Sequence, residues 1–484
     1  MAKFKTKDGV GIIPKGTKVI EDRAFANRSS LKSVIIPDSV TVIKARAFEG
    51  CTSLENVIIS DSVTVIEMRA FEGCTSLENV VIPKSVTEIG WGAFKGCTSL
   101  DNVVIPKSVT EIGWGAFLGC TSLESIVVAE GNPVYDSREG CNALIETKTN
   151  TLITGCGSTI IPESVTKISD NAFLGCTSLK RVRIPDSVTV IGSQTFEGCT
   201  SLKWVRIPDL VTRIGERAFY GCSSLESVII PDLVTRIGER AFYGCSSLKN
   251  IRIPEGVTKI RKEAFYGCTS LKNVIISDSV TVIEARAFEG CTSLELVVIP
   301  NSVTAIETRA FYGCTSLDNV VIPKSVTEIR WNVFYGCTSL ENIRIPEGVT
   351  KIEPGAFEGC TSLKNVIIFD SVTVIEPRAF EGCTSLELAV IPNSVTEIGY
   401  CAFEGCTSLE NVIIPKSVTK IGLDSFSGCI SLESVTLLSR AELYNGLFAN
   451  CPSLQTINVP SDYVDYYKEY LPEELHDKIV ELDR

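Results

Sequence analysis

Histidine is almost absent from this chain of 484 residues, which contains a single one, His476. Serine and cysteine catalytic triads need an imidazole beside the nucleophile, and histidine-rich metal sites need several. Cysteine pairs of the C-x-x-C type and phosphate-binding loops of the GxxxxGK[ST] type are also missing. The sequence therefore predicts a protein that is not an enzyme and holds no cofactor.

Long apolar segments and an excess of positive charge are absent as well. No apolar run approaches the length of a membrane span, so membrane insertion is not expected. The formal net charge of −12 argues against nucleic-acid binding. Residues 1–7 are basic, like the first segment of a signal peptide, but no hydrophobic segment follows. As given, the chain is expected to carry no secretion signal, and its compartment stays open.

Cysteine, in contrast, is abundant and regularly spaced. Sixteen of the 20 cysteines follow a 23-residue period, from Cys51 to Cys120 and again from Cys176 to Cys429. A fixed period of this length is typical of a stack of similar coils. Phenylalanine follows the same period and extends it from Phe25 to Phe448. We therefore expect about twenty coils that bury their apolar side chains only against neighbouring coils.

One period, Cys74 to Gly96, shows how a coil is built. Leu77, Val80 and Ile82 form the L-x-x-L-x-L pattern of a leucine-rich repeat, in which a short strand points alternate side chains inward. Pro83 then ends the strand, a second short strand follows over residues 86–89, and residues 93–96 turn back. The predicted fold is an α/β solenoid, a right-handed superhelix with stacked parallel strands, short second strands and helical turns.

Two segments interrupt the period within a predicted single domain spanning 1–484. Residues 5–128 and 161–460 are regular coils, whereas residues 129–160 alternate around a polar turn at 148–150, which predicts a β-hairpin projecting from one coil. Residues 461–484 are expected to form a helical cap that seals the last coil, with Ser461 or Asp462 at its N-cap.

The regular cysteines are predicted to be a ladder of buried free thiols. Disulfide frameworks have irregularly spaced cysteines, whereas these cysteines are evenly spaced. Cys401 lies outside the ladder, at the turn position that Arg69 occupies in an earlier coil, and is expected to be the exposed thiol. Cys141 and Cys156 flank the hairpin. Either they form a disulfide, or Cys156 fills the buried leucine position of its coil.

The residue between the last two inward residues of the strand is predicted to face outward in every coil, and we call this column the lane. Its members are Ile35, Ile58, Val81, Val104, Val127, Arg183, Arg206, Ile229, Arg252, Ile275, Val298, Val321, Arg344, Ile367, Val390 and Ile413. A contiguous exposed apolar lane often marks a binding surface, although the β-propensity of valine and isoleucine alone also explains it.

Basic and aromatic side chains gather just after the hairpin. These candidate binding residues, which we call the basic patch, are Lys180, Arg181, Arg183, Lys203, Trp204, Arg206, Lys249 and Arg252. In an acidic protein they suggest a dock for an acidic partner segment or an anionic glycan.

Two other surface columns are regular. Trp91 and Trp114 occupy equivalent turn positions in adjacent coils and are expected to stack, either as a further binding feature or as a consequence of coil duplication. A threonine column that includes Thr64 and Thr87 is expected to form hydrogen bonds between coils.

The repeat C-T-S-L-x-x-V-x-I-P-x-S-V-T-x-I-x-x-x-A-F-x-G resembles the BspA-like class of bacterial leucine-rich repeats over nearly the whole chain. The resemblance implies a secreted or cell-surface protein of host-associated bacteria that adheres to matrix proteins or cells. It supplies no catalytic residues to transfer.

These features lead to an adhesin-type scaffold, expected to be a monomer, that binds a protein ligand such as a host extracellular matrix protein, or an acidic glycan, through its strand face. The alternatives are an intracellular protein-interaction scaffold and a self-assembling structural rod.

Overall fold

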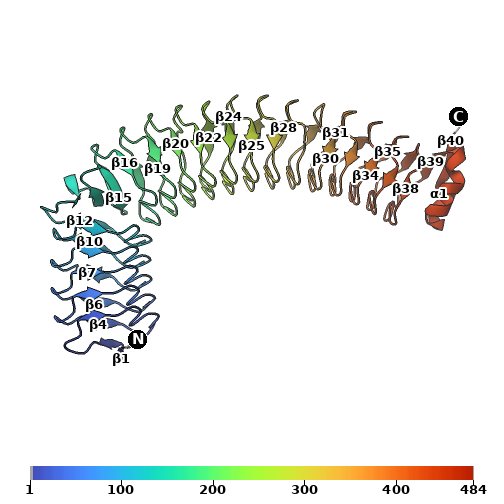
Figure 1. Cartoon of the computed structure of the whole chain (residues 1–484). Helices are drawn as coiled ribbons and strands as arrows, with labels where there is room; N and C mark the ends of the chain where they lie inside the picture. Colours follow the sequence, from blue (N-terminus) through green and yellow to red (C-terminus); the bar gives the residue numbers. More distant parts are fainter. Residues whose placement is uncertain (1–3, 483–484) are drawn as a thin grey trace. The chain divides into compact units, whose positions relative to one another are not determined.

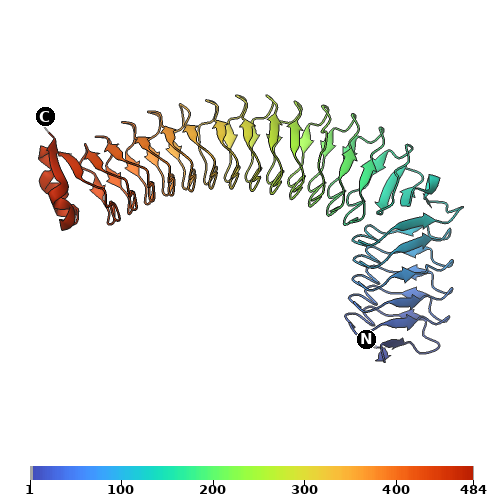
Figure 2. The same cartoon turned by 180° about the vertical axis from the view of Figure 1, so that it is seen from behind.

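The computed structural model describes residues 4–482. The chain falls into two compact units, residues 1–234 with 244–246, and residues 235–243 with 247–484. Each unit is a stack of coils whose strands lie side by side (Figures 1 and 2). The predicted solenoid is confirmed, with about 21 turns in all. The single domain over 1–484 stays a prediction, and each unit is described by itself.

In the first unit most coils contribute two strands, which align in separate parallel ladders, and the first two strands of the chain form an antiparallel pair. The first strands are β1 (Lys5–Lys7), β2 (Val10–Ile12), β4 (Ser33–Ile35), β6 (Asn56–Ile58), β8 (Asn79–Val80), β10 (Asn102–Ile105), β12 (Ser125–Val128), β17 (Arg181–Arg183) and β19 (Trp204–Arg206). The second strands are β3 (Val19–Ile20), β5 (Val42–Ile43), β7 (Val65–Ile66), β9 (Glu88–Ile89), β11 (Glu111–Ile112), β16 (Lys167–Ile168), β18 (Val190–Ile191) and β20 (Arg213–Ile214).

The second unit repeats this arrangement. Its first strands are β22 (Asn250–Ile253), β24 (Asn273–Ile276), β26 (Leu296–Val298), β28 (Asn319–Val321), β29 (Asn342–Arg344), β31 (Asn365–Ile367), β33 (Leu388–Val390), β35 (Asn411–Ile414), β37 (Ser434–Leu437), β39 (Thr456–Pro460) and β40 (Ile479–Leu482). Its second strands are β21 (Arg236–Ile237), β23 (Lys259–Ile260), β25 (Val282–Ile283), β27 (Ala305–Ile306), β30 (Lys351–Ile352), β32 (Val374–Ile375), β34 (Glu397–Ile398), β36 (Lys420–Ile421) and β38 (Glu442–Leu443).

Coils pair in register at a shift of 23 residues, so equivalent side chains form continuous columns. Val34 lies opposite Val57, and Ile35 opposite Ile58, in a parallel pair. Buried phenylalanine rings stack along the third side of the coil, with ring centroids 5.3 Å apart between Phe71 and Phe94. The predicted threonine ladder is confirmed, as Thr87 Oγ1 donates to the backbone oxygen of Thr64 at 3.3 Å.

The regular cysteines form the buried ladder that their period predicts. All 20 cysteines are free and buried. The thiol of Cys97 donates to the carbonyl oxygen of Phe71 at 3.2 Å, and the same bond recurs in most coils. The Phe71 carbonyl also accepts from Cys74 N at 3.2 Å, so the thiol adds a second hydrogen bond, which crosses between coils.

Cys401 is buried, so its predicted exposure is wrong. It occupies the left-handed turn position, with φ 55°, that Arg69 holds with φ 57°. The short thiol does not reach solvent as an arginine does, and lies among the carboxylates of Glu381 and Glu404. Burial, aided by Glu404, raises the pKa of the Cys401 thiol to about 12.

The hairpin is present but does not project. Strands β14 (Ala143–Glu146) and β15 (Thr151–Gly155) pair antiparallel, with β13 (Tyr135–Asp136) on β14 and β15 parallel to β16. A short 3-10 turn, η1 (Arg138–Gly140), joins β13 to β14. Residues Ala143, Leu144, Ile145 and Leu152 are fully buried, so the hairpin forms part of the coil wall.

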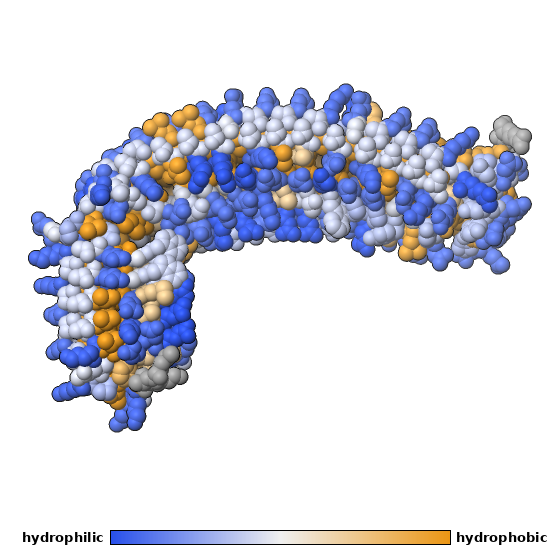
Figure 3. Space-filling model, in the orientation of Figure 1, coloured by the Kyte–Doolittle hydropathy of each residue, from blue (hydrophilic) through white to orange (hydrophobic). Residues whose placement is uncertain are grey.

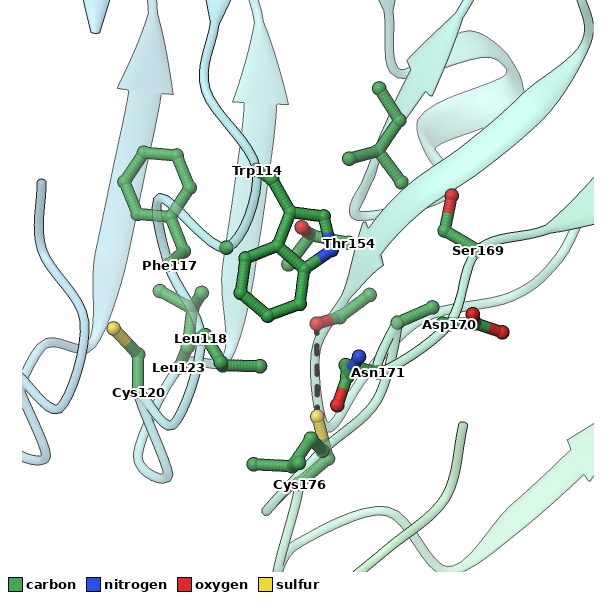
Figure 4. A pocket seen from close by; sticks show the side chains of 15 residues that line it. Trp114, Phe117, Leu118, Cys120, Leu123, Thr154, Ser169, Asp170, Asn171 and Cys176 are labelled. Carbon is green, nitrogen blue, oxygen red and sulfur yellow. Dashed lines mark hydrogen bonds between the residues drawn. The ribbon is translucent and has the colours of Figure 1, made fainter. Parts of the chain in front are cut away.

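The phenylalanine column is interrupted at the hairpin. Phe173 instead packs against the backbone of Gly155, where a Cβ would lie 2.1 Å from its ring. A small cavity of about 50 Å³ remains there, with Trp114 and Phe117 on one side and Asn171 and Cys176 on the other (Figure 4). The two hairpin cysteines are free, and Cys156 takes the buried position of its coil by donating to the Asn142 carbonyl at 3.1 Å.

The last coil is sealed by a cap of η2 (Ser461–Tyr463), α1 (Val464–Tyr470) and η3 (Glu473–Lys478) (Figure 1). The N-cap of α1 is Tyr463, with no side-chain cap, so the assignment of Ser461 or Asp462 to this position is wrong. Sealing comes from the fully buried Tyr467, whose hydroxyl donates to the Ser439 carbonyl at 2.6 Å. Strand β40 also extends the first-strand ladder, which the sequence did not predict.

We predict that Phe71→Ala lowers the free energy of unfolding by about 3–5 kcal/mol, because it removes a buried ring between two stacked neighbours. The matched surface variant Val81→Ala is expected to change it by less than about 0.5 kcal/mol. Urea unfolding followed by circular dichroism measures both. Equal losses in the two variants would show that the ring column does not stabilise the fold.

A second prediction concerns alkaline unfolding. Burial raises the pKa of Cys51 to about 11 and of Cys120 to about 12. Above about pH 8.5 the unfolded chain loses thiol protons that the folded chain keeps, so stability falls as pH rises towards the folded pKa values. In the triple variant Cys74→Ala, Cys97→Ala, Cys120→Ala, the free energy of unfolding is expected to fall less steeply between pH 8 and 11. The difference from wild type is up to about 1.4 kcal/mol per pH unit for each thiol removed, and urea unfolding at each pH measures it. If the free energy of unfolding falls with pH as steeply in the variant as in wild type, the buried thiols are not the cause of the alkaline loss of stability.

Candidate functional site: the exposed face of the first strands

The predicted lane is exposed. In the first unit its members Ile58, Val81, Val104 and Val127 keep between 41% and 78% of their surface open to solvent. They alternate with inward residues such as Val80 and Ile82, which are buried. Figure 3 shows apolar surface running as a stripe along the coils of this unit. The second unit carries its own exposed run, which includes Ile275, Val298 and Val321.

One lane member escaped the sequence analysis. Ile160 lies one period before Arg183 and is 77% exposed, so it continues the lane across the interrupted coil. The ten additional residues of the hairpin region hide this offset when the period is counted from Cys120. Counting backwards from Cys176 would have revealed it.

The structure brings part of the basic patch together. Strands β17 and β19 pair in parallel, with Arg181 opposite Trp204 and Arg183 opposite Arg206. Lys180 and Lys203 precede these strands and are exposed. Lys249 and Arg252 are also exposed, but they belong to the second unit and are described with it.

Two of the arginines are already compensated by acidic neighbours. Arg183 Nη1 lies 2.7 Å from Glu163 Oε1, and Arg206 Nη1 lies 2.5 Å from Asp186 Oδ1. The hydrogen bond to Asp186 raises the pKa of Arg206 above its ordinary value. Among the described residues no ion pair joins Lys180, Arg181 or Lys203, so these three carry the net positive charge of the patch in the first unit.

The tryptophans stack as predicted. The ring centroids of Trp91 and Trp114 are 6.1 Å apart and nearly parallel, at 16°. The guanidinium of Arg69 lies 4.2 Å from the Trp91 ring centroid, a cation–π contact that leaves Trp91 half-buried and Trp114 exposed. Both belong to the turns that follow the second strands, so they are separate from the basic patch.

A column of carboxylates lies beside the lane, and the sequence analysis missed it. Glu55, Glu78, Asp101 and Glu124 stand three residues before their lane neighbours and are exposed. Backbone bonds hold them in register, with Asp101 N 3.1 Å from Glu78 O and Glu124 N 2.8 Å from Asp101 O. Among the described residues no cation pairs with these four carboxylates. The sequence could have revealed this column, because an acidic residue stands at the same position of the repeat in four successive coils.

One group in the second unit has ligand atoms close enough for a metal ion. The sulfur of Cys401 and carboxylate oxygens of Glu381 and Glu404 lie within 4.8 Å of one another. However, Arg378 Nε already lies 3.5 Å from Glu381 Oε2 and supplies positive charge there. The cluster is therefore explained by the arginine and glutamate columns of the turn. No helix among residues 4–482 is long and apolar enough to cross a membrane.

The chain was compared with known proteins. No curated protein sequence matches the chain. A leucine-rich cell surface protein of Faecalibacterium prausnitzii is 32% identical over 68% of this chain and 96% of its own, with a TM-score of 0.47. Leucine-rich repeat proteins of Eubacterium ventriosum and Bacteroides ovatus are 24% and 27% identical, cover 75% and 91% of this chain and 92% and 87% of their own, and have TM-scores of 0.50 and 0.35.

The family model for the BspA type leucine-rich repeat region matches residues 13–137, 154–272, 258–387 and 376–471. These matches leave out most of the hairpin and cover most of the chain. The chain therefore belongs to the BspA-type leucine-rich repeat family.

Proposed function

We propose that this protein is a non-enzymatic adhesin-type scaffold that binds a protein ligand through the exposed face of its first strands. The observation that carries the proposal is the lane, in which one aliphatic side chain per coil stays exposed over successive coils. Contiguous apolar surface of this kind is uncommon on soluble proteins unless it binds something. Membership of a repeat family whose coils form protein-binding scaffolds supports the same conclusion.

The scaffold holds this face rigidly. Most lane residues lie on a strand of the first-strand ladder, and Ile58, for example, lies on β6, which pairs with β4 on one side and β8 on the other. A partner therefore meets a surface whose backbone is ordered before binding, which lowers the entropic cost of association.

The basic patch is a separate part of the same face. We propose that Lys180, Arg181 and Lys203 attract an acidic segment of the ligand or an acidic glycan, because they carry charge that no neighbouring carboxylate neutralises. Trp204, which is 43% exposed, adds an aromatic surface beside them. Lys249 and Arg252 are proposed to contribute in the second unit, and Trp91 and Trp114 to offer a stacking surface on the turns.

The test is a binding screen of the full chain against immobilised fibronectin, fibrinogen, acidic glycans and whole-cell surfaces. For a ligand found there, the triple variant Ile58→Ser, Val81→Ser, Val104→Ser is expected to bind at least tenfold more weakly, because three central apolar contacts are lost. The control variant Val190→Ser, Leu210→Ser, Leu233→Ser removes three exposed aliphatic residues outside the lane. It is expected to bind within about twofold of wild type.

Surface plasmon resonance gives the dissociation constants, and circular dichroism checks that both variants are folded. A lane variant that binds as well as wild type, or a control variant that loses as much, would overturn the assignment of the binding face.

A further inference from the structure

We infer that the first unit receives a basic amphipathic helix, whose lysine or arginine side chains meet the carboxylate column and whose apolar side chains cover the adjacent lane. This inference rests on the proposed function and names the class of ligand for one part of the strand face. The surface consists of four coils, which begin at Glu55 and end at Val127. It is an acidic and aliphatic surface on one sheet, with the two columns parallel to the stacking direction.

The charge of the carboxylate column indicates that the partner is positively charged. The carboxylates of Glu55, Glu78, Asp101 and Glu124 are exposed and joined by no ion pair among the described residues. Like charges one coil apart repel each other, and a cationic ligand removes that repulsion. In the second unit the equivalent column is partly paired, because Lys272 pairs with Glu295 at 3.2 Å and Lys364 with Glu341 at 3.5 Å, while Glu387, Glu410 and Glu433 of the same column are exposed.

Cations limit the surface at both ends. The same column carries Lys32 one coil before Glu55, and Lys180 on the next regular coil after the hairpin. The acidic stretch therefore spans three steps between stacked strands, or about 15 Å. A helix of about ten residues covers this length, at a rise of about 1.5 Å per residue.

The spacing of the coils favours a helix over an extended ligand. Stacked strands lie about 4.8 Å apart, and one helical turn advances about 5.4 Å, so a helix lying along the stack presents one cation and one apolar residue to each coil. In an extended strand, same-side residues are about 6.7 Å apart and lose register after two steps. A polyproline helix repeats about every 9.3 Å and would meet only every second carboxylate.

The lane supplies the apolar half of the contact. Ile58, Val81, Val104 and Val127 are exposed aliphatic residues in the same four coils as the carboxylates. The asparagine side chains of Asn56, Asn79 and Asn102 lie between the two columns and are exposed. They add hydrogen-bonding groups without charge at the boundary, and Asn102 Nδ2 donates to Asp101 Oδ2 at 2.7 Å.

The probe is a synthetic helical peptide of about 18 residues, made of leucine, lysine and alanine with one leucine and one lysine per turn. Its partner peptides are one of identical composition, in which the same lysines stand at alternate residues of one segment, and one with glutamate in place of lysine. Calorimetry of the full chain with each peptide is carried out at low and physiological salt. The helical basic peptide is expected to bind saturably, and at least tenfold more tightly than either partner peptide, with an affinity that falls as salt rises.

Charge reversal gives the matched comparison. The triple variant Glu78→Lys, Asp101→Lys, Glu124→Lys is expected to bind the basic peptide at least tenfold more weakly, because three attractions become repulsions. The control Asp22→Lys, Glu111→Lys, Glu130→Lys changes the net charge equally at exposed carboxylates outside the column. Its affinity is expected to stay within about twofold of wild type.

Three outcomes would overturn the inference: equal binding of the alternate-lysine peptide, an equal loss in the control variant, and no binding of the basic helix. The proposed function is judged separately with the protein ligand from the screen. A ligand lost in the lane serine variant but retained by the charge-reversed variant leaves the proposed function intact and refutes the basic helix.

Discussion

The contact on which the structure depends joins the cysteine of one coil to the phenylalanine of another. The thiol of Cys97 donates to the carbonyl oxygen of Phe71, while the Phe71 ring stacks on Phe94. The Phe71 carbonyl also accepts from Cys74 N within its own turn, so an alanine in place of Cys97 would remove only the hydrogen bond that crosses between coils. Because the contact recurs in most coils, it helps to hold the turns in register, and both strand ladders share that register.

Register also explains why the surface is organised in columns. When every coil has the same length, the residues at one position of the repeat lie above one another on the same face of the stack. A run of four acidic residues at one offset becomes a continuous acidic column beside the lane, and basic residues at the same offset become a patch. All coils share nearly the same backbone. The binding properties of such a fold are therefore determined by which side chains follow one another along each column.

The hairpin is the place where the first unit departs from this rule. It replaces the phenylalanine turn of one coil, keeps β15 paired with β16, and lets Phe173 pack on Gly155. Stacking continues across the interruption, although one ring of the aromatic column is missing. The lane is also maintained there, through Ile160, and the charge of the neighbouring column changes sign beyond it.

The sequence by itself determined the repeat, the inward and outward positions of Val80 and Val81, and the buried thiol ladder. These depend on a constant period and on the alternation of a strand, which are local properties. Only the tertiary structure decided that Glu163 and Asp186 neutralise Arg183 and Arg206, because each acid belongs to the coil before its arginine and the pairing depends on how far the two side chains reach. It also decided that Cys401 is buried and that the hairpin lies in the wall, since side-chain length and packing, and not spacing, determine both.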